Sequence, residues 1–291
     1  MRAYILSVNV TEKSMRPRII AEIASSHNGD IELAKRMVRS AAETGVDIVK
    51  FQSWQSKNVD ENDSDKARYA SLELSDEAHY ILKEECEKVG VEFATTCYDT
   101  GRIPFLKELG LKSIKIASTD LKHVNFLKGI RENFEEVIVS TGMSEKEEML
   151  KAIDILKTGK YTIMHCVSVY PCPLEKANMQ KLLWLKGVAD SVGYSDHTEG
   201  IEAAVFAMGM GVDYIEKHFT LDKGMEQIPH TVGKGMKPIT THMIASEPSV
   251  FKEMCGWRDK YVIALGDGAL GMLPEERLTR MKYTGRLGKN D

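Results

Sequence analysis

The sequence predicts an α/β protein that folds as a (β/α)8 TIM barrel. Short apolar runs rich in β-branched residues alternate with amphipathic helical windows, and the alternation repeats about eight times over roughly 250 residues. The runs are nearly continuously apolar, which is typical of parallel strands covered on both faces. A doubly wound sheet is the main alternative. No GxGxxG turn follows the first run, which weakens the dinucleotide-binding form of that alternative.

Eight segments are expected to form the strands, in this order: "PRIIAEIAS" (17–25), "VDIVKFQS" (46–53), "VEFATTCY" (91–98), "LKSIKIAS" (111–118), "EEVIVSTG" (135–142), "YTIMHCVS" (161–168), "DSVGYSDH" (190–197) and "VDYIEKHF" (212–219). Each contains aliphatic, β-branched or aromatic residues that favour strands. Three windows between them have the spacing of an amphipathic helix: 30–45, 75–90 and 144–159. Four glycines that end helical windows suit left-handed C-caps: Gly45, Gly90, Gly110 and Gly159.

One barrel domain is expected over residues 17–266, between an N-terminal extension (1–16) and a C-terminal tail (267–291). No tandem repeat, Pro-rich linker or low-complexity tract marks a second domain. The longest polar interruption, residues 54–75, follows the second strand. A barrel carries its active-site loops at such positions.

The composition is that of an ordinary globular protein, with 43% hydrophobic and 28% charged residues. A net charge of −4 argues against a nucleic-acid coat or a polybasic membrane patch. The five cysteines are odd in number and form no CxxC pair, so a reduced protein is expected rather than a disulfide framework. No signal-peptide core or membrane-length apolar stretch is present, so a cytoplasmic location is expected.

Polar residues end every predicted strand, and reactive groups gather at the carboxyl ends of barrel strands. Lys50 in "DIVKFQ" and Lys115 in "SIKIAS" lie within otherwise apolar runs. A buried ammonium needs an anion or several hydrogen-bond acceptors. Two interpretations stay open for these lysines. One is a salt bridge to a nearby carboxylate; the other is a phosphate or carboxylate clamp, completed by the hydroxyls of Thr96, Ser118, Ser140 and Ser195.

Two histidines, His197 in "YSDH" and His218 in "IEKH", end consecutive predicted strands. Two imidazoles so placed can bind one divalent ion and leave positions for water and substrate. The alternative is a pair of hydrogen-bonded core histidines. His165 lies mid-strand in "TIMHCVS" and is expected to pack. No Cys/His spacing indicates structural zinc.

Several motifs resemble, in order and spacing, the barrel domain of the sialic acid synthase (N-acetylneuraminate synthase) family. They are "IIAEIASSHNGD", "VKFQ", "FATTCYD", "IKIAST", "VIVSTGMS", "MHCVSVYP", "GYSDHTEG" and "IEKHFTLD". The resemblance runs from about Pro17 to about Pro238, and the combination of motifs is highly specific.

The resemblance implies condensation of phosphoenolpyruvate with an open-chain N-acylaminohexose, giving a nine-carbon 2-keto-3-deoxy acid and phosphate. It also implies a divalent metal, Mn²⁺ or Mg²⁺, bound by His197 and His218. Phosphoenolpyruvate would be held by Lys50, Thr96, Lys115, Ser118, Ser140 and Ser195. The catalytic residues would be Glu22, Lys115 and Glu216, with either glutamate handling the attacking water. The sugar would contact Gln52, Ser168 and Tyr170.

The sequence departs from the family pattern at expected sugar-binding positions and at the domain that covers the active site. Pro229 stands where an aspartate is usual, Ser168 where an asparagine is common, and Cys97 where a proline is common. The family's C-terminal antifreeze-like (SAF) domain is not expected here, so the lid over the site would come from a separate chain or from the 54–75 loop. A homodimer and a separate lid protein are the candidate partners. A synthase for another 2-keto-3-deoxy sugar acid, and a non-catalytic barrel that binds sugar or phosphoenolpyruvate, are the alternative functions.

Overall fold

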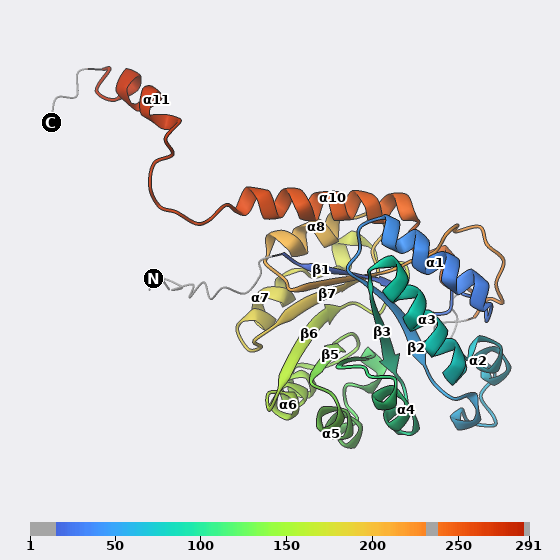
Figure 1. The fold of residues 1–291 in the computed structure, drawn as a ribbon. Coiled ribbons are helices and arrows are strands. Elements are labelled where there is room, and N and C mark those ends of the chain that lie inside the picture. Colours follow the sequence, from blue (N-terminus) through green and yellow to red (C-terminus); the bar gives the residue numbers. More distant parts are fainter. Residues whose placement is uncertain (1–15, 231–237, 288–291) are drawn as a thin grey trace.

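The computed structural model describes residues 16–230 and 238–287 and confirms the (β/α)8 barrel. Eight parallel strands close into one barrel in the order β1 to β8, and β8 pairs with β1. Helices surround the strands (Figure 1). The strands are β1 (Arg18–Glu22), β2 (Ile48–Ser53), β3 (Glu92–Cys97), β4 (Ser113–Ile116), β5 (Glu136–Ser140), β6 (Lys160–Cys166), β7 (Val192–Asp196) and β8 (Tyr214–His218).

Eleven α-helices are described in these two ranges. They are α1 (Ile31–Glu43), α2 (Lys66–Leu72), α3 (Asp76–Val89), α4 (Ile103–Glu108), α5 (Val124–Asn133), α6 (Lys146–Leu156), α7 (Gln180–Lys186), α8 (Glu202–Gly209), α9 (Thr241–Ile244), α10 (Pro248–Leu265) and α11 (Glu276–Tyr283). Short 3-10 helices are Ser56–Asn58, Thr100–Arg102, Ser118–Asp120 and Leu174–Lys176. The predicted loop 54–75 therefore contains one 3-10 turn and the helix α2.

The helix ends follow from local hydrogen bonding. Asp30 caps α1 by accepting from the backbone N–H groups of Glu32 and Leu33. Gly90 ends α3 in the left-handed conformation, as predicted. The prediction for Gly159 is wrong: it is not among the residues with positive φ, and α6 ends at Leu156. Gly159 instead leaves room for Arg131, whose guanidinium would lie 2.7 Å from an added Cβ.

The core has two parts because strand residues alternate between the inside and the outside of the barrel. The larger part lies between strands and helices and includes Phe51, Leu82 and Phe251, all fully buried. The smaller part fills the barrel interior and consists of Ile20, Ile48, Ile138, Met164 and Tyr214. This apolar plug forms a floor below the polar residues at the strand ends.

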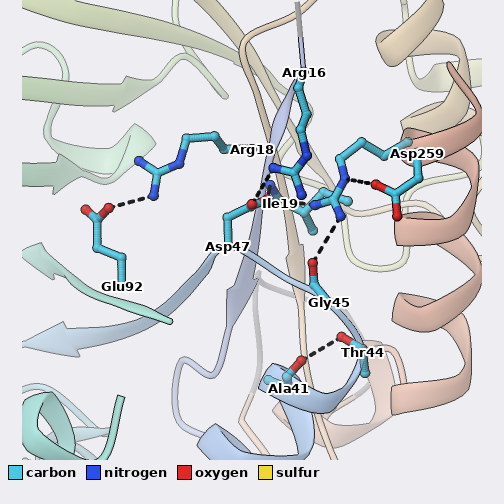
Figure 2. A network of polar contacts seen from close by, with 10 residues as sticks. Arg16, Arg18, Ile19, Ala41, Thr44, Gly45, Asp47, Glu92 and Asp259 are labelled. Carbon is cyan, nitrogen blue, oxygen red and sulfur yellow. Dashed lines mark hydrogen bonds and ion pairs between the residues drawn. The ribbon is translucent and has the colours of Figure 1, made fainter. Parts of the chain in front are cut away.

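A network of hydrogen bonds and ion pairs joins the first strand of the barrel, β1, to its last helix, α10 (Figure 2). Asp47 accepts from the backbone N–H of Ile19 at 2.8 Å and pairs with Arg16 at 2.5 Å. The other contact of this carboxylate is Arg258 of α10, at 2.8 Å. Because α10 also packs on α1 and α8, it belongs to the barrel. Helix α11 stands apart from it (Figure 1).

Strand β1 begins at Arg18 and α10 ends at Leu265. The domain limits 17–266 stay a prediction. Nearly all of the predicted N-terminal extension lies outside the described residues. The five cysteines are buried and free, as expected of a protein without a disulfide framework. Among the described helices, none is long and apolar enough to cross a membrane.

Candidate active site

A cavity of about 740 Å³ opens at the carboxyl ends of the strands. This volume is typical of small-molecule sites. All thirteen residues predicted from the sequence as site residues line it: Glu22, Lys50, Gln52, Thr96, Lys115, Ser118, Ser140, Ser168, Tyr170, Ser195, His197, Glu216 and His218. The structure therefore brings together side chains from all eight strand ends.

The strand register explains why these side chains meet. Facing residues in neighbouring strands form pairs at one height of the barrel: Glu22 with Lys50, Glu22 with His218, Thr96 with Lys115, and Ser195 with Glu216. Their side chains point inward because each position has the same parity as the apolar plug below it. A slip of one residue would turn the whole set toward the helices.

The centre of the cavity floor is a buried group of two lysines and two glutamates, here called the ionic quartet: Glu22, Lys50, Lys115 and Glu216. Each is at most 6% exposed. The Nζ of Lys115 donates to both oxygens of Glu216, at 3.0 and 3.2 Å. The Nζ of Lys50 contacts Glu22, lies 3.5 Å from Glu216, and donates to the Thr96 hydroxyl at 2.8 Å. Both lysines thus have the carboxylate partners that one sequence interpretation required.

The two glutamates of the quartet differ in their protonation chemistry. Burial raises the pKa of Glu22 to about 7, although Lys50 opposes the shift. Burial would also raise the pKa of Glu216, but Lys115 and Lys50 together hold it far below its usual range. Glu216 further accepts from the Ser195 hydroxyl at 2.9 Å. Glu216 is therefore a fixed anion, and Glu22 is the carboxyl group that can exchange a proton near neutral pH.

The two predicted metal ligands lie side by side above the quartet. The rings of His197 and His218 are 5.5 Å apart, and the Tyr170 ring lies 4.1 Å from His197. The Nδ1 of His197 donates to the carbonyl of Val167 at 2.8 Å, so Nε2 carries a lone pair when the ring is neutral. Burial lowers the pKa of His197, but the neighbouring Cys166 outweighs this effect and raises it. Burial, with the nearby His197, lowers the pKa of His218 to about 3, so this ring is neutral.

These histidines fit a divalent cation. Metal ligation needs neutral imidazoles, and a backbone acceptor commonly orients the ring from its other nitrogen. The Nδ1 of His218 is buried and has no hydrogen-bond partner among the described residues. Within the same part of the chain, no group of three or more His, Cys, Asp and Glu side chains is placed to hold a metal. A cation here would therefore take its remaining ligands from water or substrate.

Buried polar atoms without a partner gather in this cavity. For the part of the chain that the structure describes, the lining residues with such atoms are Glu22, Arg68, Asp99, Ser140, His218 and His230. An unpaired buried polar atom costs about 1–3 kcal/mol. Such a concentration is expected where a polar ligand completes the hydrogen bonds.

The mouth of the cavity is built largely by the segment after β2. Its lining residues are Trp54, Gln55, Asn58, Val59, Asp60, Asp63, Asp65, Arg68, Tyr69 and Leu72. The Trp54 indole donates to the Tyr69 carbonyl at 3.2 Å, which folds α2 back over the strand ends. The length and position of this loop predict that it contributes to the site, but no residue pattern singles out Arg68 or Tyr69.

Some polar residues at the strand ends do not reach the cavity. Asp196 and Lys217 have the opposite parity and form a buried pair at 2.8 Å outside the barrel. The Nε2 of His165 donates to the Ala177 carbonyl at 2.7 Å, and its ring packs on Tyr194, as expected for a core histidine. The position of each side chain relative to the pleat, rather than its chemistry, separates these residues from the site.

Comparison with known proteins gives consistent matches. The model of the NeuB family matches residues 37–269. The chain is 35% identical to N,N'-diacetyllegionaminic acid synthase of Campylobacter jejuni, over 86% of this chain and 78% of the relative. It is 29% identical to mouse N-acetylneuraminate-9-phosphate synthase, over 94% and 76%. A citrate-bound N-acetylneuraminic acid synthetase from Leptospira borgpetersenii superposes with a TM-score of 0.83 at 29% identity, covering 95% and 94%.

Proposed function

Because the chain belongs to the NeuB family, we propose that it condenses phosphoenolpyruvate with an open-chain aminosugar to form a nine-carbon 2-keto-3-deoxy sugar acid and phosphate. The acceptor would be an N-acylaminohexose of the N-acetylmannosamine type. The observation that carries this proposal is the ionic quartet at the floor of the cavity. Above it, the cavity walls contain two adjacent histidines and buried polar atoms that have no hydrogen-bond partner among the described residues. A barrel that only bound sugar would not need this combination of groups.

The phosphoenolpyruvate end of the cavity would be the quartet and its hydroxyls. Lys50 and Lys115 supply positive charge, and the Ser140 hydroxyl has no partner among the described residues. Charge-assisted hydrogen bonds from ammonium groups to phosphate or carboxylate are short and strong. The anions would draw the ammonium groups partly away from Glu22 and Glu216. Thr96, Ser118 and Ser195 would complete the binding shell.

His197 and His218 would hold Mn²⁺ or Mg²⁺, as their geometry permits. When bound, the ion would polarise the aldehyde oxygen of the sugar. Tyr170, stacked near His197, would keep that ring in place and border the reacting carbons. Gln52 and Ser168 would contact the sugar.

Glu22 and Glu216 would have different roles in the reaction. C3 of phosphoenolpyruvate forms the new bond to the aldehyde carbon, water adds to the electron-poor C2, and phosphate leaves with the bridging oxygen. Glu22 would take the proton from this water, because its buried Oε1 has no donor among the described residues and burial raises its pKa to about 7. Glu216, held as an anion by both lysines, would stabilise positive charge as it develops at C2.

The proposal is tested by phosphate release from phosphoenolpyruvate, measured with Mn²⁺ and with a chelator. The acceptors are N-acetylmannosamine, mannose, a 6-deoxy diacetamido-hexose and arabinose. Metal-dependent release with one sugar supports the reaction and identifies the acceptor, which the differing products in the relatives' names leave open. If no acceptor causes phosphate release, in a protein shown to be folded and to bind phosphoenolpyruvate, the result would contradict catalysis by this chain.

A further inference from the structure

A buried ion pair lies next to the two histidines, on the outer face of the barrel wall. Asp196 and Lys217 face each other across β7 and β8, and their side chains pair at 2.8 Å. Each precedes one histidine in the sequence, since His197 follows Asp196 and His218 follows Lys217. Asp196 is 1% and Lys217 3% exposed, and neither of them lines the cavity. A ligand in the cavity therefore does not contact this pair.

The hydrogen bonds of the pair go mainly to the turn that carries His197. The Oδ1 of Asp196 accepts from the backbone N–H of Thr198 at 2.9 Å and from the Thr198 hydroxyl at 2.8 Å. The same oxygen accepts from the Tyr194 hydroxyl at 3.2 Å. The Nζ of Lys217 donates to Oδ2 of Asp196 and, at 2.5 Å, to the carbonyl of Thr198. The backbone on both sides of His197 is thus fixed from outside the barrel.

Stability alone does not explain why charged residues occupy these two positions. Removing two ions from water is costly, and replacing a buried pair by apolar residues of similar size is often neutral or stabilising. Other outward-facing strand residues, such as Tyr194 and Ile215, pack in the apolar layer between strands and helices. Apolar side chains at 196 and 217 would supply neither a donor for the Thr198 carbonyl nor an acceptor for its N–H. The charges therefore serve the geometry of the turn.

The position of the His197 ring depends on this turn. Its Nδ1 donates to the Val167 carbonyl, and its backbone carbonyl accepts from the Cys172 N–H, both at 2.8 Å. Val167 and Cys172 follow β6, so both contacts require that residues 196–198 keep their place beside the β6 loop. The rings of His197 and His218 are 5.5 Å apart. A displaced turn would change this separation.

We propose that Asp196 and Lys217 are positioning residues for a divalent-metal site, and that they set the spacing and orientation of His197 and His218 without contacting the ion. This inference rests on the metal assignment within the proposed function. Removing a partner that orients a metal-binding histidine typically weakens metal affinity by about 10- to 100-fold. Because this pair acts through the backbone, we expect the lower end of that range, a loss of about tenfold.

The test measures the Mn²⁺ affinity of the complete chain, with free Mn²⁺ quantified by electron paramagnetic resonance during a titration. Equilibrium unfolding in urea is measured on the same variants. The first variant, Lys217→Met, leaves Asp196 as an unpaired buried anion and should lower stability. The second adds Asp196→Asn, which keeps an Oδ1 acceptor for the Thr198 N–H and leaves no isolated charge.

The matched control makes the corresponding exchange at the opposite end of the barrel. It combines Asp47→Asn with Arg258→Met, which removes the pair at 2.8 Å that joins the start of β2 to α10. Both Lys217 variants should bind Mn²⁺ about tenfold more weakly than wild type. The double variant should regain most of the stability that Lys217→Met loses, and the control should keep wild-type affinity. Recovered stability without recovered affinity distinguishes positioning from a purely structural role.

Three results would overturn the inference: wild-type Mn²⁺ affinity in the double variant, an equal loss of affinity in the control, or no saturable Mn²⁺ binding by wild type. The titration contains neither sugar nor phosphoenolpyruvate, so its outcome does not depend on turnover. A wild-type chain that binds Mn²⁺ but releases no phosphate with any acceptor would contradict the proposed condensation, and the affinities of the variants would still decide the role of the pair.

Discussion

Replacing Lys115 by methionine tests whether the quartet is one electrostatic unit. The substitution removes the ammonium that lies 3.0 Å from Oε1 of Glu216. The remaining contacts of this carboxylate are Lys50 at 3.5 Å and the Ser195 hydroxyl at 2.9 Å. A buried anion would then be only partly compensated, and the folded state should lose stability.

The magnitude follows from Coulomb's law and desolvation. Two unit charges 3.0 Å apart attract by about 5 kcal/mol at an effective dielectric constant of about 20. The buried ammonium no longer needs to be desolvated, which offsets part of this loss, so the free energy of unfolding should fall by about 3 kcal/mol. Glu216→Gln should cost a similar amount. The double variant should cost about 2 kcal/mol less than the sum, because no isolated charge from this pair remains.

The assay is equilibrium unfolding in urea, followed by circular dichroism and by tryptophan fluorescence, with coincident transitions required before free energies are compared. Lys88→Met is the matched control, since Lys88 forms an exposed pair with Glu84 at 2.9 Å, and its transition midpoint should stay that of wild type. Strict additivity of the two quartet variants would refute the reasoning. In addition, phosphoenolpyruvate should stabilise wild type far more than Lys115→Met, while the apparent affinity for sugar changes less.

Three further predictions concern the metal, acid stability and the position of α2. His197→Ala and His218→Ala should each abolish metal-dependent phosphate release and the rise in melting temperature caused by Mn²⁺; full activity in either variant would contradict the metal assignment. Burial lowers the pKa of His79 to about 4, so the unfolded chain binds more protons between pH 6.5 and 4, and stability falls in that range as pH decreases. His79→Phe should reduce this loss, by up to about 1.4 kcal/mol per pH unit, in urea titrations at several pH values; an unchanged slope would show that His79 does not titrate as described. Gly29→Ala should displace α2 and raise the KM for sugar, because Gly29 has a φ of 76° and an added Cβ would lie 2.3 Å from the Ser71 carbonyl; wild-type kinetics would show that this contact is dispensable.

The fold could be predicted from the sequence because its signals are local and repeated. The eight apolar runs correspond to β1 to β8, and the windows 30–45, 75–90 and 144–159 contain α1, α3 and α6. The failure at Gly159 has a physical cause: a glycine after a helix can serve close packing, here of Arg131, as well as a left-handed turn. Sequence alone does not separate these two uses.

For the candidate site, too, the sequence predicts some features and not others. Lys50 and Lys115 were conspicuous because a charge inside an apolar run is costly unless paired. Their partners could not be chosen among many carboxylates, since the pairing depends on the strand register that brings Glu216 opposite Ser195 and close to Lys115. Arg68 was missed because its place at the mouth depends on how α2 folds back over the barrel.

The central claim is tested most directly by the stoichiometry of the reaction. Phosphoenolpyruvate and the accepted sugar are incubated with the protein and a divalent metal, phosphate is quantified, and the second product is identified by high-resolution mass spectrometry. The account predicts one phosphate per molecule of a new 2-keto acid whose mass equals the two substrates plus water minus phosphate. Phosphate release without this product, or release that does not depend on the sugar, would contradict it.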